Sequence, residues 1–466
     1  MKPIITELNN SLSAPLYIQL YENIKNSIVA GEIQQGEKLP SLRSISQNFE
    51  ISITTAQLAY NQLLVEGYIV SKPQSGYYAA QGVYGNKIVS EPAKHSNMEN
   101  DKSYHEKYPY IYDPNCFDFN KWKKCSSTVF NEYHDQLLYE SNPQGEYSLR
   151  FEISKYLYSS RGVKCTPEQI VIGAGTQQIT SHLCRILSKI GVNHVSLESP
   201  GYLPVQSMFQ DSGFAISHIP VHKDGIEISK LPVNIPSAVY ISPSNQFPTG
   251  AVMPAGRRYQ LLEWAMSNNS IIIEDDYDSE LRYFGKPVPA LQSLDTNNNV
   301  VYLGSFSSTL FAAIKISYMV LPDSLTKIFS QIKSQYTQTC SKAEQLTLAL
   351  FMEKGFYYTG IRKLRNLYSQ KLQHVTQSFS RYCGQNIKAT NTQSGINIII
   401  RVHSSKPADE LCLLAKSIGL QMVPVADISD QDTSSLIFYY NQLPLPEIDN
   451  LIKNLSKIWD IKNEKM

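Results

Sequence analysis

Residues 270–278 read Ser-Ile-Ile-Ile-Glu-Asp-Asp-Tyr-Asp, and this stretch decides the fold of most of the chain. The uninterrupted β-branched run 271–273 is typical of a strand that is buried on both faces of a parallel sheet. Carboxylates follow at once, and a buried carboxylate is costly unless a cation or hydrogen-bond donors meet it. The stretch therefore predicts a buried strand whose carboxyl end, at Asp275 and Tyr277, faces a ligand.

Similar short apolar runs lie on both sides of this strand, separated by segments with helical periodicity. They cover residues 169–172, 194–197, 238–242 and 300–304. Buried strands that alternate with helices predict an α/β body with a mostly parallel sheet. Farther on, residues 345–460 mix helices with strands such as 396–402 and 436–440, which predicts a smaller α+β lobe. We expect a body over 108–460, with a large lobe at about 140–340.

Residues 11–80 carry a different pattern, that of three short helices and a hairpin. The first helix, over 15–30, is indicated by apolar residues four positions apart: Leu16, Leu20, Ile24 and Ile28. A second should begin after the N-cap Ser41, and a third near 52–54. Two alternating segments, 68–70 and 77–79, flank a turn and predict a wing. Such a winged helix-turn-helix can place one helix in a DNA major groove.

Cations and hydroxyl groups at the helix starts and on the wing are the candidate DNA contacts. They are Lys38, Ser41, Arg43, Ser52, Thr54, Thr55, Lys72, Ser75 and Gly76. Acidic residues slightly outnumber basic ones in this head, so a dimerisation or protein-contact module is the alternative. Few phosphate contacts would make a single head bind weakly, and we therefore expect a dimer with two heads.

The rest of the chain narrows the class of protein. Residues 81–107 are polar and predict a flexible linker on the order of 25 residues. The formal net charge of +1 gives no global sign of nucleic-acid binding. Neither a signal peptide nor a membrane span is expected, which favours the cytoplasm. The seven scattered cysteines, without a CxxC pair, indicate reduced thiols and no metal site.

The head resembles the winged helix of the GntR family of bacterial regulators. The resemblance rests on Pro15-Leu16-Tyr17, Leu39–Arg43, Ala59-Tyr60, Glu66-Gly67-Tyr68 and Ser75-Gly76. It implies that Arg43 and the start of the third helix meet DNA. One departure concerns sequence readout, because Ile53 stands where the family usually has an arginine.

The body offers four of the five parts of a site for pyridoxal phosphate (PLP). Gly175, Thr176 and Gln177 open a helix after an apolar strand and can hold a phosphate. Tyr202 can stack on the ring, and Asp275 can pair with the pyridine nitrogen. Asn245 and Tyr277 can donate hydrogen bonds to the phenolate oxygen. In sequence order these segments look like a fold-type I aminotransferase, and with the head they resemble the MocR subfamily of GntR regulators.

The fifth part, the lysine that forms the Schiff base, is missing. The family's segment ends in Ser-Lys, whereas this chain reads Ser305-Phe306-Ser307-Ser308. A hydroxyl group forms no imine, so covalent PLP at Ser308 is excluded. Lys315 stands where an arginine normally holds the phosphate, with Ser305 and Ser307 as further candidates. No arginine occurs in 436–443, where relatives often bind a substrate carboxylate, and Gln442 is the nearest polar candidate.

Together these features predict a cytoplasmic, dimeric, DNA-binding transcriptional regulator that is not an enzyme. Its body senses a small molecule, either noncovalent PLP, its amine form PMP, or an unrelated metabolite, and repositions the heads on an operator. The resemblance implies a head-to-tail homodimer. Two other classes stay open: a PLP-dependent aminotransferase with an appended DNA-binding head, and a purely structural dimeriser.

Overall fold

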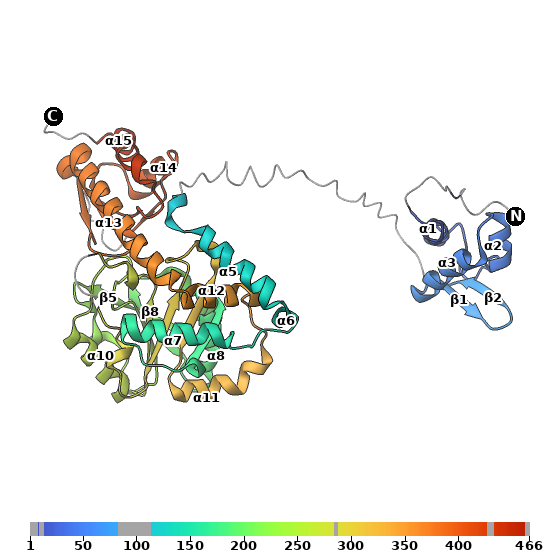
Figure 1. Cartoon of the computed structure of the whole chain (residues 1–466), viewed down its shortest axis with the longest axis horizontal. Helices are drawn as coiled ribbons and strands as arrows, with labels where there is room; N and C mark the ends of the chain where they lie inside the picture. The colour runs from blue at the N-terminus through green and yellow to red at the C-terminus, as the bar shows by residue number, and fades with distance from the viewer. Residues whose placement is uncertain (1–7, 9–13, 83–112, 284–287, 426–432, 462–466) are drawn as a thin grey trace. The chain divides into compact units, whose positions relative to one another are not determined.

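The computed structural model describes residues 8, 14–82, 113–283, 288–425 and 433–461. The chain divides into two compact units, Met1–Tyr104 and His105–Met466, called here the head and the body (Figure 1). Most of the expected linker, from residue 83 to 107, lies outside the described residues.

The head is a winged helix-turn-helix, as predicted. Its elements are α1 (Leu16–Val29), α2 (Leu42–Asn48), α3 (Ile53–Val65), β1 (Ile69–Lys72) and β2 (Gly76–Ala79). Ser41 and Ser52 cap α2 and α3, since their hydroxyl oxygens accept the backbone N–H groups of Ser44 and Thr55. The strands pair antiparallel around the turn. The apolar stripe of α1 packs against Ala59 and Leu63 of α3 in one buried cluster.

The large lobe of the body is built on a mixed sheet. Its strands are β3 (Ile170–Ala174), β4 (His194–Ser199), β5 (Ala215–His222), β6 (Gly225–Ile226), β7 (Ala238–Ile241), β8 (Ile271–Asp276), β9 (Val300–Ser305) and β10 (Ile316–Val320). Among the described residues their order is β3-β10-β9-β8-β7-β4-β5-β6. The pairs β9-β8, β8-β7, β7-β4 and β4-β5 are parallel. At the two ends, β10 runs antiparallel to β3 and β9, and β6 runs antiparallel to β5. All five predicted strands of this lobe are therefore confirmed.

Helices cover both faces of this sheet (Figure 1). The helices of the large lobe are α5 (Phe119–Glu132), α6 (His134–Leu137), α7 (Tyr147–Arg161), α8 (Thr176–Lys189), α9 (Leu203–Asp211), α10 (Ala255–Ser267), α11 (Asp323–Ile332) and α12 (Lys342–Glu353). Alternate side chains of β3 point to the two faces of the sheet. Ile170 and Ile172 lie on one face and pack with α7 and α12. Val171 points the other way and packs with α8, α9 and α11.

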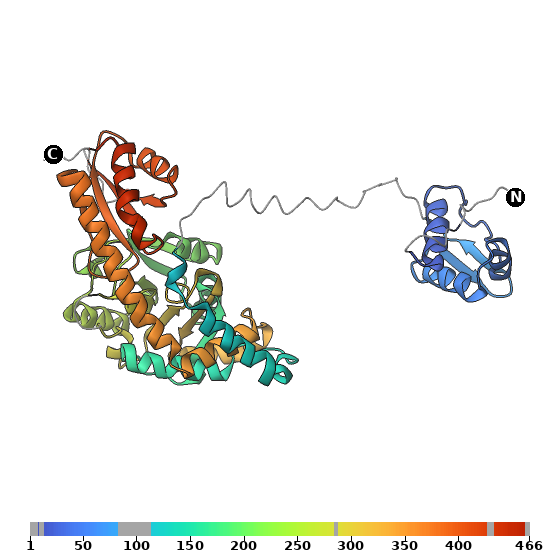
Figure 2. The ribbon, with the colours of Figure 1, turned by 45° about the horizontal axis from the view of Figure 1, so that its top comes forward.

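The small lobe has an antiparallel sheet of order β11-β12-β14-β13 among the described residues. Its elements are β11 (Ile387–Thr390), β12 (Asn397–His403), α14 (Ala408–Lys416), β13 (Met422–Pro424), β14 (Thr433–Tyr439) and α15 (Ile448–Ile458). The long helix α13 (Phe356–Cys383) extends from one lobe to the other (Figure 2). Its first turns pack in the large-lobe core and the rest in the small-lobe core. The division between the lobes thus lies within α13, later than the expected position near 345.

A buried ion pair joins the first described residue of the body to α13. Asp113 Oδ2 lies 2.7 Å from Lys371 Nζ, and neither side chain is more than 2% exposed. Lys371 also donates to the backbone carbonyl of Asn441, 2.7 Å away. The body end of the chain that leads to the head is therefore fixed to the small lobe.

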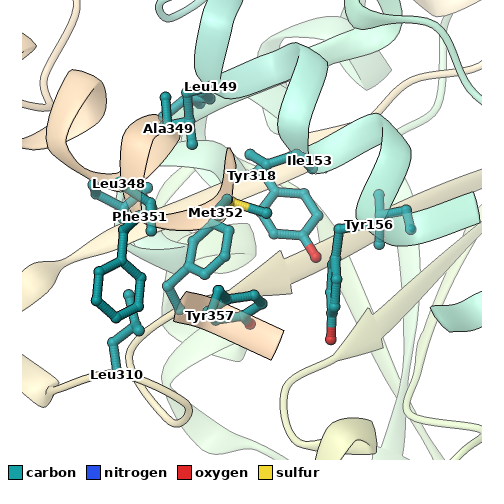
Figure 3. Close-up of a cluster of buried hydrophobic side chains, with 14 of the residues drawn as sticks. Leu149, Ile153, Tyr156, Leu310, Tyr318, Leu348, Ala349, Phe351, Met352 and Tyr357 are labelled. Atoms are coloured by element: carbon teal, nitrogen blue, oxygen red, sulfur yellow. The ribbon is translucent and has the colours of Figure 1, made fainter. Parts of the chain in front are cut away.

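The segment that follows β9 rests on a tight aromatic core. Leu310 packs in one cluster with Phe351, Met352 and Tyr357 (Figure 3). The Thr309 and Tyr357 hydroxyl groups share a hydrogen bond of 3.0 Å. This packing fixes the backbone next to Ser308.

Candidate functional site

The candidate ligand residues gather at one edge of the large-lobe sheet because of the strand register. β8 and β9 run parallel and place Asp276 opposite Gly304. Ser305, the last residue of β9, pairs with Ser317 of β10. The same strand, β10, pairs Ile316 with Ala174 at the end of β3. Asp275, Ser305, Lys315 and Gly175 therefore all lie at the same end of four neighbouring strands.

Two of the three consecutive carboxylates of β8 are fully engaged by the protein. Glu274 accepts the backbone N–H groups of Leu291 and Gln292, both at 2.8 Å. Asp276 forms a buried ion pair with Arg161 at 2.7 Å, and also accepts the hydroxyl of Tyr302. These contacts offset the cost of burying two charges on one strand.

The third carboxylate, Asp275, lacks such compensation. Its Oδ2 accepts a hydrogen bond from the Tyr240 hydroxyl at 2.6 Å. Within the described residues no lysine, arginine or histidine forms an ion pair with it. Burial raises the pKa of Asp275 to about 7, against the opposing hydrogen bond from Tyr240. Such a carboxyl group is poised to take a cationic nitrogen from a ligand.

An anion can bind at the same end of the sheet, next to strands β3 and β10. Gly175, with φ +83°, precedes α8, and no side chain caps the helix. The first N–H groups of a helix lack intrahelical acceptors and, with the helix dipole, favour an anionic group. Lys315 is exposed beside them, directly before β10, in the left-handed region at φ +48°. The start of α8, the Lys315 side chain and the Ser305 hydroxyl thus lie at the ends of the neighbouring strands β3, β10 and β9.

Position 308 is occupied by a hydroxyl that the protein itself engages. Ser308 Oγ donates to the backbone carbonyl of Tyr277 at 2.5 Å. Ser305 Oγ accepts the N–H of Ser307 at 3.3 Å and the hydroxyl of Ser317 at 3.0 Å. These bonds tie the loop after β9 to the loop after β8. No amine is present on the Ser308 side chain to react with an aldehyde.

The aromatic residues of the site are close, but Asn245 is largely occupied. Phe247 lies between Tyr202 and Tyr277, with ring centroids 6.2 Å from each. The Asn245 amide donates to both oxygens of Asp278, at 2.9 and 2.8 Å, and reaches the Tyr277 hydroxyl only at 3.4 Å. Its carbonyl oxygen accepts the Ser394 hydroxyl from the small lobe. Asn245 therefore joins the two lobes, a role that its sequence position did not reveal.

A cavity of about 700 Å³ opens beside Tyr202, between the loop after β4 and strands β13 and β14. Its wall includes Glu198, Tyr240 and Phe247, none of which the sequence singled out. Glu198 ends an apolar strand just as Asp275 does, and that signal was available in 194–199. Burial raises the pKa of the Glu198 carboxyl to about 8.

In the head, the wing carries a small cationic surface. The ammonium groups of Lys38 and Lys72 lie 5.9 and 4.5 Å from the centre of the Tyr78 ring. The Ser75 hydroxyl shares a 2.6 Å hydrogen bond with the Tyr78 hydroxyl. Tyr78 therefore brings together three candidate residues, Lys38, Lys72 and Ser75, which come from different parts of the head sequence.

The helix starts of the head present the other candidates. Arg43 and Thr54 are exposed on the first turns of α2 and α3, and Gly76 opens β2. Ser41, Ser52 and Thr55 take part in the caps, with the Ser52 and Thr55 hydroxyls 2.8 Å apart. Ile53 is 51% exposed at the first position of α3, so the third helix begins with an apolar contact surface instead of a charged one.

Comparison with known proteins agrees with this architecture. Residues 16–78 match the family of bacterial regulatory proteins called gntR, and residues 119–426 match aminotransferase class I and II. An uncharacterized HTH-type transcriptional regulator of Bacillus subtilis (strain 168), YdeL, is 38% identical over 97% of this chain and 99% of its own. The chain belongs to the GntR-type transcriptional regulators with an aminotransferase-like body.

Other similarities to this regulator are more distant. The probable rhizopine catabolism regulatory protein MocR of Rhizobium meliloti is 28% identical over 90% of this chain and 88% of its own. A crystal structure of Pyrococcus horikoshii kynurenine aminotransferase has a TM-score of 0.64 at 23% identity, covering 79% of this chain and 95% of that one. The latter likeness concerns the fold alone.

Two further properties of the regulator bear on its chemistry. The seven cysteines are free thiols. In the part of the chain that the structure describes, no helix is long and apolar enough to cross a membrane, and no group of three potential metal ligands occurs.

Replacing Arg161 with Met should destabilise the body, because it leaves Asp276 buried without its cation. We expect a loss of about 3–5 kcal/mol in the free energy of unfolding. Urea denaturation followed by tryptophan fluorescence measures it, since all three tryptophans lie in the body. Lys155→Met is the control, because its ion pair with Glu152 is half-exposed and should contribute under about 1 kcal/mol. Equal losses in both variants would contradict this account.

Asp275→Asn should change how stability depends on pH. Because burial raises the pKa of Asp275 to about 7, the folded protein holds this proton at pH values where the unfolded chain has released it. Asp275 thus lowers stability progressively as the pH rises from about 4 to 7. The asparagine variant should lack this loss and be more stable than the parent at pH 8, without ligand. Urea midpoints at several pH values test this, and parallel curves would refute it.

Proposed function

We propose that this regulator binds a pyridoxal-type molecule or a related metabolite without a covalent bond, and that this binding controls its hold on DNA. The observation that carries the proposal is the uncompensated Asp275, buried at the sheet edge opposite a free helix start. A protonated pyridine nitrogen would supply the cation that Asp275 lacks, and a phosphate group would meet Gly175, Thr176, Gln177 and Lys315.

The residues present fit noncovalent PLP or PMP better than covalent PLP. Such a group, when bound, supplies an electron sink for chemistry on amines. At position 308 this chain offers only a hydroxyl that donates to Tyr277. Tyr202 would cover one face of the ring, and Tyr277 would donate to its phenolate oxygen. We therefore propose that the body does not turn over amino acids and that it works as a sensor in the cytoplasm.

The exposed apolar surface of the body supports a homodimer. Large apolar side chains of α5 to α7 are more than half exposed: Phe119, Phe130, Leu138, Tyr147 and Tyr158. Such residues on neighbouring helices favour association with a second copy. The two heads of a dimer then bind two half-sites, and the overall affinity for DNA is higher than the weak affinity of one head. A ligand that prefers one arrangement of the body changes the spacing of the heads.

Lys38→Ala and Lys72→Ala should weaken binding to any double-stranded DNA and lower its salt dependence. Each lysine that contacts a phosphate contributes about 1 to the slope of log affinity against log salt concentration. Fluorescence anisotropy with an unrelated labelled duplex measures both quantities. Lys25→Ala is the matched control, because Lys25 lies on α1 against Tyr21 and Glu22. A loss in the control as large as in the wing variants would place the DNA surface elsewhere.

PMP and PLP should stabilise the full-length regulator, and the Asp275→Ala variant should lose this effect. A ligand of the folded state raises the melting temperature by mass action. Borohydride treatment followed by mass spectrometry should leave the mass of the PLP-treated parent unchanged, because Ser308 cannot form a reducible bond. Ser308→Lys is the comparison that should gain the mass. A pyridoxyl adduct on the parent chain would contradict the noncovalent proposal.

A further inference from the structure

The cavity beside Tyr202 has mostly apolar and aromatic walls. Tyr202 and Phe247 come from the large lobe, with ring centroids 6.2 Å apart and nearly perpendicular. Val423, Ile437 and Tyr439 come from the small-lobe strands β13 and β14, where Val423 pairs with Ile437. A cavity of about 700 Å³ with such walls suits an aromatic or branched apolar group.

The ionisable side chains of this cavity wall are few, and they include Glu198 and the exposed His218. Among its lining residues, all in the described part of the chain, no lysine or arginine occurs. Its acidic member is Glu198, and Tyr240 connects the wall to Asp275 through a 2.6 Å hydrogen bond. The neighbouring cations Lys223 and Arg282 line a second cavity, of about 890 Å³. A ligand carboxylate in the first cavity would thus meet the Glu198 carboxyl group, and the basic side chain of the lining is the exposed His218.

Glu198 has an unused hydrogen-bonding capacity. Its side chain is buried, with Oε2 accepting the Ser242 N–H at 3.2 Å and the Gln246 amide at 3.4 Å. Oε1 has no hydrogen-bond partner among the described residues. A buried oxygen without a partner costs free energy that a ligand donor would recover.

We propose that the effector is a primary amine that carries an aromatic or branched apolar group and lacks a carboxylate. Glu198 Oε1 binds the amine nitrogen, and the apolar group packs among Tyr202, Phe247 and Ile437. This inference rests on the proposed function, since it names the ligand class of the sensor site. An ammonium group beside Glu198 favours the carboxylate form of that residue, so charge and hydrogen bond act together.

The identity of residue 437 supports the exclusion of amino acids. Ile437 lies on β14 in the cavity wall and within 436–443, a stretch that contains no arginine. An isoleucine here can contact a side chain but cannot hold a carboxylate. Because this part of the cavity wall has no group that binds a carboxylate, it favours an amine over the corresponding amino acid.

The test uses two probes that differ only in the carboxylate: phenethylamine and L-phenylalanine. Calorimetry on the full-length regulator should show phenethylamine binding at least about tenfold more tightly, the factor that corresponds to one charge-assisted hydrogen bond. Glu198→Gln should weaken phenethylamine binding by about tenfold. Val423→Arg, at a position that is 38% exposed, should gain L-phenylalanine binding without disturbing the core. Ile437→Arg is the second variant of this kind.

The outcomes separate this inference from the proposed function. Equal or tighter binding of L-phenylalanine by the parent chain overturns the amine assignment, as does binding of neither probe with or without PMP. An unchanged phenethylamine affinity in Glu198→Gln overturns the role of Glu198. Stabilisation by PMP is measured in the same samples and depends on Asp275. If PMP stabilises the protein but phenethylamine does not bind, the proposed function stands and the amine assignment fails. If phenethylamine binds but PMP does not stabilise the protein, only the proposal of PMP binding is refuted.

Discussion

The burial of three consecutive carboxylates on one strand is the constraint on which the body depends. A strand in the middle of a sheet gives no access to water, so each charge needs a partner from the protein or a ligand. Arg161, at the end of α7, serves Asp276, and the backbone of 291–292 serves Glu274. These contacts hold α7 and the loop after 288 against β8. Asp275 stands between them with a tyrosine hydroxyl as its partner.

Much of this arrangement could be predicted from the sequence. The apolar runs marked the buried strands, and the acidic residues after 273 marked the carboxyl end of β8, where the candidate ligand residues gather. Capping serines and four-residue spacing predicted the head, while the lack of a Schiff base at Ser308 stays a prediction. In each case the signal is local, since a few adjacent residues determine burial, capping or chemistry.

The contacts that the sequence did not reveal join residues far apart in the chain. The Tyr240 hydroxyl reaches Asp275 from a neighbouring strand, and Ser394 reaches Asn245 from the other lobe across 149 positions. Asn245 was expected to donate to a ligand, yet most of its capacity is used by Asp278 and Ser394. The division between the lobes was expected near 345, but α12 packs in the large lobe and α13 in both. Such pairings follow from tertiary packing, which local patterns do not encode.

The ion pair of Asp113 with Lys371 has a mechanical consequence. It ties the backbone at Asp113 to α13, and the Lys371 ammonium group holds the carbonyl of Asn441 at the same time. Residues 113, 371 and 441 of the body therefore meet at one buried point, where neither charged side chain is more than 2% exposed. A pull on the chain at Asp113 is thus borne by α13 and the small lobe, because separating the pair would leave a buried charge without its partner.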